Sequence, residues 1–333
     1  PTHGFGSFCS AAATVGLDST IAQQKESNPA CTIDEDQFVE ELINGLDAYP
    51  AYYAHMAPAN QAGPGPVDLT LPERADATEL RRRIDAGEWV VDLRSRRVFA
   101  DGHLRGTLSF DGAGNVVTYL GWLIPWGTPL TFLAETADQI TAIQRELVRI
   151  GIDRPEAYSD GPLAGWLLSD SDLASYRRAD FAELDAALDA DPELLVVDAR
   201  RRTEWQDGHV TGARLVPLHE FVARLDEIVT WARAAAHSGR DATIWVYCGS
   251  GFRASAAASL LERAGASVVH VDADVAIVLI DGLARKRQGT APLQSYRDYS
   301  RSQLDAHVTA FYGQWEHIRG RGFVRQLARA FEV

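Results

Sequence analysis

The chain has 333 residues, which is enough for two or three domains of ordinary size. Its composition, with 46% apolar and 23% charged residues, is typical of a soluble globular protein with a sizeable core. Acidic residues outnumber basic residues 46 to 32, which gives a formal net charge of −14. Such a surface repels phosphate backbones and anionic lipids, so we expect neither nucleic acid nor a membrane among the partners.

The three cysteines, Cys9, Cys31 and Cys248, are too few and too scattered for a disulfide framework or a four-thiolate zinc site. The chain starts at Pro1 without an initiator Met, and it lacks the basic and apolar stretches of a secretory signal. We therefore expect a cytoplasmic protein with reduced thiols, and a chain that is either processed or part of a longer one.

Residues 1–68 show little hydrophobic periodicity and end in Gly63-Pro64-Gly65-Pro66, which is typical of a linker.

An internal repeat follows the linker. Val91-Asp92-Leu93-Arg94 and Gly102-His103 recur 106 positions later as Val197-Asp198-Ala199-Arg200 and Gly208-His209. This match predicts two copies of one domain, which we place at residues 69–170 and 171–290.

The second copy alternates predicted helices with short apolar strands. We expect helices over 181–188, 220–236 and 254–264, and strands over 194–198, 243–247 and 267–271. The alternation predicts an α/β fold in which helices flank a parallel sheet on both faces. Ligands of such sheets bind beyond the carboxyl ends of the strands, and Cys248 directly follows one of them.

The strongest candidate site is the loop that runs from Cys248 through Gly249, Ser250, Gly251 and Phe252 to Arg253. Its backbone N–H groups and the amino end of the next helix can surround a negatively charged atom, and so favour a nucleophilic thiolate. The arginine adds a planar set of donors for an oxyanion. The alternative is a buried, inert cysteine, but the glycines and the arginine favour function. Cys9 and Cys31 lack a basic partner, and we interpret both as structural or incidental.

The order of motifs resembles the rhodanese-like sulfurtransferases across about residues 175–290. The motifs are Cys-x-x-Gly-x-Arg at 248–253, Glu204-Trp205, and Gly208-His209-Val210-Thr211-Gly212-Ala213. The resemblance implies a sulfurtransferase in which Cys248 and Arg253 are catalytic and the backbone of Gly249, Ser250, Gly251 and Phe252 binds the substrate sulfur. Cys248 would carry sulfane sulfur as a persulfide from thiosulfate or a low-molecular-weight persulfide to a thiol or cyanide acceptor.

The length of the loop separates sulfur transfer from phosphate transfer. A related loop with one more residue between Cys and Arg is the phosphatase form, whereas here Arg253 lies five positions after Cys248. The spacing therefore favours sulfur chemistry over an arsenate reductase or phosphatase, although all three use a nucleophilic cysteine.

The first copy is predicted to lack an active site. Cys248 precedes Gly265 by 17 residues, and counting back 17 from Gly151 leads to Ala134, where residues 133–138 hold neither thiol nor arginine. We expect this copy to pack on the second and to form a wall of its substrate cleft. The pattern that includes Asp198, Arg200, Glu204 and His209 is kept in the copy without the nucleophile, so we interpret these residues as structural.

Residues 291–333 place arginines between aromatic side chains. A nucleic-acid patch is one reading of this tail. We favour a helical tail that packs its aromatic face on the body, because the chain as a whole is acidic.

The order of His3, Ser19-Thr20-Ile21, Tyr49–Tyr53 and His55–Asn60 resembles the end of metallo-β-lactamase-fold hydrolases, most closely the persulfide dioxygenases fused to rhodanese repeats. The resemblance implies that residues 1–68 are a remnant of that fold and that His3 was its last metal-site histidine. The metal-binding His cluster is absent, and a lone histidine cannot hold a catalytic ion. We therefore expect no metal or cofactor in this chain, and Fe(II) or Zn only in the missing part of a larger parent.

Two functions of different kinds follow from these motifs. The leading hypothesis is a tandem rhodanese sulfurtransferase whose partners are small-molecule sulfur donors and thiol acceptors. The alternative is a non-catalytic rhodanese scaffold that organises the metallo-hydrolase portion of the parent. A homo-oligomer is compatible with both.

Overall fold

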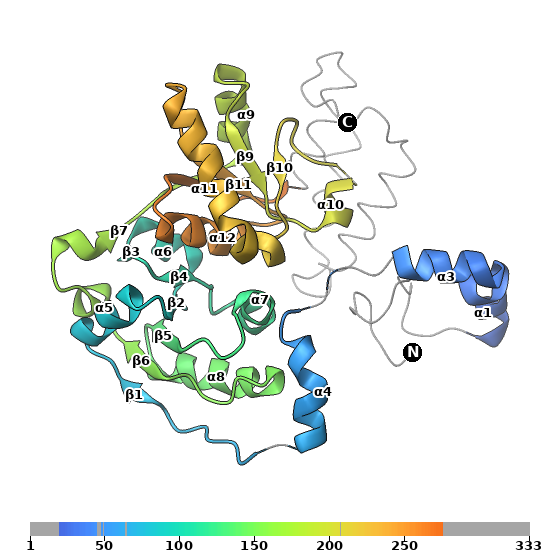
Figure 1. Ribbon diagram of the computed structural model, residues 1–333, viewed down its shortest axis with the longest axis horizontal. Coiled ribbons are helices and arrows are strands. Elements are labelled where there is room, and N and C mark those ends of the chain that lie inside the picture. Colours follow the sequence, from blue (N-terminus) through green and yellow to red (C-terminus); the bar gives the residue numbers. More distant parts are fainter. Residues whose placement is uncertain (1–19, 45–47, 49, 64, 207, 276–333) are drawn as a thin grey trace, which may run out of the picture.

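The computed structural model describes residues 20–44, 48, 50–63, 65–206 and 208–275 (Figure 1). His3, Cys9 and the predicted tail at 291–333 lie outside these residues. Four helices precede the first sheet: α1 (Ile21–Ser27), α2 (Pro29–Thr32), α3 (Glu35–Asn44) and α4 (Tyr53–Ala62). Within the described residues, no helix is long and apolar enough to cross a bilayer.

Two five-stranded parallel sheets follow, and their strand orders are equivalent. The first runs β1-β6-β5-β2-β4 and the second β8-β12-β11-β9-β10. The bounds are β1 (Glu73–Arg74), β2 (Trp89–Asp92), β4 (Leu108–Ser109), β5 (Leu130–Ala134) and β6 (Ala157–Asp160), then β8 (Arg177–Ala179), β9 (Leu195–Asp198), β10 (Arg214–Leu215), β11 (Ile244–Tyr247) and β12 (Val268–Val271). The predicted α/β fold with a repeated parallel sheet is confirmed.

Helices cover both faces of each sheet, which is why the central strands are apolar along their whole length. In the second sheet, Val196 and Trp245 pack with α9 (Phe181–Ala190), whereas Val197 and Val246 pack with α11 (Phe221–His237) and α12 (Phe252–Arg263). In the first sheet, α5 (Ala77–Asp85) lies on one face. On the other face lie α7 (Val116–Leu123) and α8 (Ala137–Leu147).

Short elements complete the two units. They are the helices α6 (Arg96–Asp101) and α10 (Arg202–Gln206), the 3₁₀ turns η1 (Val148–Ile150), η2 (Leu163–Trp166), η3 (Asp170–Asp172) and η4 (Leu218–Glu220), and the strands β3 (His103–Leu104) and β7 (Leu173–Ala174). β3 and β7 pair antiparallel, which ties the chain just before the second sheet to the first unit.

The two units share one hydrophobic core. Phe110 and Leu120 of the first unit belong to the same buried cluster as Phe221 and Leu261 of the second. Helix α12 lies between the second sheet and strand β4 of the first (Figure 1). The backbone N–H of Ser109 on β4 donates to Ser259 Oγ on α12 over 3.0 Å.

Strand register makes Ala134 the counterpart of Cys248. Asp92 pairs with Leu133 in the first sheet, and the equivalent Asp198 pairs with Tyr247 in the second. The next residue along each central strand is therefore Ala134 in the first unit and Cys248 in the second. The first unit thus has a methyl group where the second has a thiol.

Candidate active site

Cys248 directly follows β11, the central strand of the second sheet, and only 1% of its surface is exposed. The chain then turns sharply into α12, and Gly251 makes this possible with a φ of +91°. A Cβ at this position would lie 2.4 Å from Asp272 Oδ1. Glycine is therefore required here both for the backbone angle and for the close approach of the carboxylate.

The carbonyl groups of the loop are held from outside by neighbouring donors. The N–H of Val275 donates to Gly249 O at 2.9 Å, and His270 Nε2 donates to Gly251 O at 2.8 Å. Arg96, which comes from the first unit, donates to Ser250 O at 3.4 Å. Because each peptide is planar and trans, fixing these carbonyls turns the N–H groups of the loop in the opposite direction.

One amide group of the loop contacts the sulfur. The N–H of Gly251 donates to Cys248 Sγ at 3.2 Å. Within the described residues, the amides of Gly249, Ser250, Phe252 and Arg253 donate to no acceptor. The loop therefore offers several backbone donors beside one buried thiol, an arrangement that suits negative charge on sulfur or on an atom bound to it.

Arg253 is not a free cation in this site. Its Nη1 and Nη2 bind the two carboxylate oxygens of Glu204 over 2.5 and 2.7 Å. Burial alone would lower the pKa of Arg253, but the hydrogen bonds and charge of Glu204 outweigh it and raise that pKa. Burial alone would raise the pKa of Glu204, yet the same pairing lowers it to about 2. Both groups are therefore ionised at neutral pH.

The purely structural interpretation of Glu204 is incomplete, because this side chain binds Arg253 of the candidate loop. The equivalent position in the first unit is Val98, so the pattern kept in both copies does not include this carboxylate. The sequence signal that could have identified Glu204 is that a carboxylate stands at this position only in the unit that carries the thiol.

The buried Asp–Arg pair makes the same contacts in both units. Arg200 pairs with Asp198 at 2.6 Å and donates to Gly208 O, and Arg94 makes the same contacts with Asp92 and Gly102 O. These buried pairs fix the chain after β9 and β2 and do not reach the thiol loop. His209 Nδ1 lies 3.0 Å from Trp205 O, which holds the turn that follows α10.

The first unit contacts the loop through α6 and α7. The ring of Tyr119 on α7 lies 5.3 Å from the ring of Phe252, and burial raises the pKa of the Tyr119 hydroxyl. A Cβ on Gly114 would lie 2.2 Å from the Phe252 ring, so the chain before α7 closes directly on this side chain. The ring of Phe252 thus packs against the first unit.

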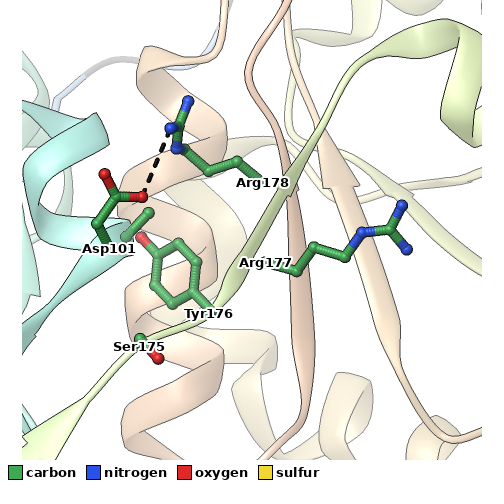
Figure 2. Close-up of a pocket in the computed structure, with 6 residues that line it drawn as sticks. Asp101, Ser175, Tyr176, Arg177 and Arg178 are labelled. Carbon is green, nitrogen blue, oxygen red and sulfur yellow. Dashed lines mark hydrogen bonds and ion pairs between the residues drawn. The ribbon is translucent and has the colours of Figure 1, made fainter.

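Asp272 connects the loop to charges of both units. This carboxylate is 2% exposed and accepts from Arg96 at 2.7 Å and Arg97 at 3.0 Å, both on α6. Arg178 on β8 lies 3.7 Å from it and reaches Asp101 on α6 at 3.5 Å (Figure 2).

The pocket in Figure 2 lies where α6 meets the strand β8 and is lined by Ala100, Asp101, Ser175, Tyr176, Arg177 and Arg178. Its charged side chains are used in ion pairs, since Arg177 pairs with Glu183 at 2.7 Å. The pocket therefore marks a junction between the units, in which Arg178 links the first unit to Asp272.

No group of three or more His, Cys, Asp or Glu side chains in the described part of the chain could hold a metal ion. Cys31 lies on α2, where it is exposed.

Residues 180–276 match the model of the rhodanese-like domain. A curated relative, the tRNA uridine(34) hydroxylase of Enterobacter sp. (strain 638), is 26% identical over 153 residues, which cover 46% of this chain and 38% of that protein. The chain spans 28% to 38% of the length of curated tRNA uridine(34) hydroxylases that it matches.

Two solved structures are also similar. A metallo-β-lactamase from Staphylococcus aureus subsp. aureus COL is 24% identical, with a TM-score of 0.40 and coverage of 48% of this chain and 44% of that chain. A thiosulfate sulfurtransferase from Pseudomonas aeruginosa is 18% identical, with a TM-score of 0.28 and coverage of 70% of this chain and 46% of that chain. Residues 180–276 thus form a rhodanese-like domain, and Cys248 to Arg253 is the candidate active-site loop within it.

Proposed function

We propose that this chain is a sulfurtransferase in which Cys248 carries a sulfane sulfur. The observation that carries the proposal is the loop itself, where Gly251 N–H donates to Sγ and four further amides have no acceptor among the residues that the structure describes. The match of residues 180–276 to the rhodanese-like domain supports the same conclusion.

The reaction has two steps at one sulfur. The Cys248 thiolate attacks the sulfane sulfur of a donor such as thiosulfate, an S–S bond forms to the cysteine, and the donor's S–S bond breaks so that sulfite leaves with the electron pair. A thiolate or cyanide then attacks the outer sulfur of the Cys248 persulfide and regenerates the thiolate. The loop amides stabilise the negative outer sulfur without rearranging, because their carbonyls are already fixed.

The test is mass spectrometry of the protein after exposure to thiosulfate or to glutathione persulfide. We expect a mass gain of one sulfur on Cys248, its loss on addition of cyanide or a thiol, and thiocyanate formation in steady state. Cys248→Ser abolishes the gain and the turnover. Activity that survives this substitution contradicts the proposal.

A non-catalytic scaffold is the alternative, and the same experiment separates the two functions. A scaffold leaves Cys248 unmodified by every donor. The buried thiol lies among amides that donate to no acceptor in the described part of the chain, which favours the enzyme, because an inert core cysteine needs no such donors.

The curated relatives are named for hydroxylation of a tRNA uridine, and we treat tRNA as a test substrate. The formal net charge of −14 disfavours a polyanion as partner. We expect no shift of labelled tRNA by the chain at 50 mM salt, and no modified uridine after incubation.

We also propose that residues 1–68 are a remnant of the metallo-β-lactamase-like domain of a persulfide dioxygenase–rhodanese fusion, which makes a low-molecular-weight persulfide the natural donor. A glutathione persulfide kcat/KM well above that for thiosulfate supports this origin, and the reverse order contradicts it.

A further inference from the structure

Glu204 is the more exposed partner in its ion pair with Arg253. The side chain of Glu204 is 34% exposed, whereas that of Arg253 is 14% exposed, and both carboxylate oxygens are bound to the guanidinium. An anion that binds at Arg253 therefore lies beside a carboxylate. The cation that the sequence assigns to the donor's oxyanion is already neutralised.

The position of Glu204 is fixed by its own backbone contact. The N–H of Arg201 donates to Glu204 Oε2 at 3.0 Å at the start of α10, so the carboxylate is held from two sides. Because the pKa of Glu204 is lowered to about 2, neutral pH does not release Arg253 by protonating its partner.

The loop amides are in a different situation. The N–H of Gly251 donates to Sγ, and within the described residues the other loop amides donate to no acceptor, so the loop can still bind the sulfur that is transferred. A donor is then held mainly by its sulfane sulfur, and each additional negative charge on the rest of the donor is repelled by Glu204.

We propose that Glu204 is a specificity-determining residue that occupies Arg253 and selects sulfane-sulfur donors of low negative charge over dianionic ones. This inference rests on the proposed sulfur transfer and adds the class of donor. Glu204 acts through Arg253 and takes no part in the bond that forms or breaks.

The test compares two donors that react in the same way and differ by one charge. Thiosulfate is a dianion that releases sulfite, and an arenethiosulfonate is a monoanion that releases a sulfinate. In both reactions, the Cys248 thiolate gains the sulfane sulfur and the leaving group keeps the electron pair of the broken S–S bond.

In Glu204→Gln, we expect kcat/KM for thiosulfate to rise roughly tenfold and that for the arenethiosulfonate less than about threefold. Glu204→Asp retains the wild-type ratio, because it keeps a carboxylate. The matched control is Glu183→Gln, which breaks an Arg–Glu pair of the same domain that does not contact the loop. The rise in kcat/KM for thiosulfate also requires Arg253, so we expect the double variant Glu204→Gln with Arg253→Gln not to show it.

Equal changes for the two donors, in either direction, overturn the inference and leave Glu204 a structural partner of Arg253. The proposed function fails by a separate result, which is the absence of a sulfur adduct on wild-type Cys248 with either donor. The ratio of the two kcat/KM values is measured from pH 6 to 9, where we expect it to stay constant in the wild type.

Discussion

His270 is a neutral donor under the cysteine loop. It is fully buried on β12, its Nε2 donates to Gly251 O, and burial lowers its pKa to about 4. The nearby charges of Asp272, Arg96 and Arg178 partly oppose one another, so burial decides the direction. The loop carbonyl is therefore fixed by a neutral imidazole at pH 7.

This burial predicts a pH dependence of stability. Between the ordinary histidine pKa near 6.5 and the folded value near 4, the unfolded chain binds the proton more readily than the folded chain. The free energy of unfolding therefore falls as the pH drops through this range, by up to about 3 kcal/mol from this residue. His270→Gln keeps a donor for Gly251 O but does not titrate, so its profile is flatter in urea unfolding at pH 7, 6, 5 and 4. Parallel profiles for the two proteins contradict the assignment.

A substitution at Gly251 gives a second prediction, for both stability and sulfur transfer. Gly251→Ala combines a positive φ with a Cβ 2.4 Å from Asp272 Oδ1, so we expect a loss of about 1–3 kcal/mol in stability and a collapse of sulfur transfer. Gly239→Ala is the control, since its φ is +74° and nothing lies within 4 Å of the added carbon. Thermal unfolding measures the loss of stability in each variant, and thiocyanate formation measures the loss of sulfur transfer. Gly239→Ala reports the effect of backbone strain alone, and Gly251→Ala reports strain together with displacement of the loop. Equal losses in both variants rule out the role of the close approach.

Helix α12 both positions the loop and connects the two units. Its amino end carries the loop, and its body packs between the second sheet and β4, with eight buried residues from Ala254 to Leu261. Small side chains allow this double contact, because alanine and serine let neighbouring backbones approach closely. The loop therefore rests on an element that both units hold in place.

Ser259→Ala tests this contact. The substitution removes the acceptor of the buried Ser109 N–H, which then has no partner, so we expect a destabilisation of about 1–3 kcal/mol. Ser238→Ala is the matched control, because its hydroxyl is exposed and donates to Ala234 O in the last turns of α11. Chemical denaturation gives both values. A Ser259→Ala protein as stable as the control contradicts the proposed contact between the units.

The larger elements were predictable because each is a continuous apolar run or a clear helical period. The expected helix at 181–188 is observed at Phe181–Ala190, and the expected strand at 243–247 at Ile244–Tyr247. Strands of two or three residues, such as β8 and β10, are too short to leave a period in the sequence. The loop was recognisable from its own residues, because its chemistry is contained in six consecutive positions.

Contacts made across the chain were not predictable in the same way. Glu204 lies 49 residues from Arg253, and Arg96 lies 154 residues from Ser250, so no local pattern joins either pair. Each depends on how α10 and α6 are placed by the sheets. The sequence indicates the candidate nucleophile, whereas the tertiary structure decides how much unpaired positive charge surrounds it.

At the scale of the whole molecule, the first unit is joined to the loop although it carries no thiol. The two units share a buried core, α6 reaches the loop carbonyl of Ser250 through Arg96, and the chain before α7 closes on Phe252 at Gly114. A change in the first unit that moves the Phe252 ring should therefore alter chemistry at Cys248.

Gly114→Ala makes this change without a substitution in the second unit. The added Cβ would lie 2.2 Å from the Phe252 ring, so the ring and the start of α12 must shift, and we expect kcat/KM for sulfur transfer to fall on the order of tenfold. Gly165→Ala is the control in the same unit, since nothing lies within 4 Å of its Cβ and its φ is not positive. Circular dichroism establishes that both variants are folded before the rates are compared. If Gly114→Ala is as active as Gly165→Ala, the first unit contacts the second without shaping the site. If only Gly114→Ala loses activity, the first unit forms a wall of the active site although it carries no thiol.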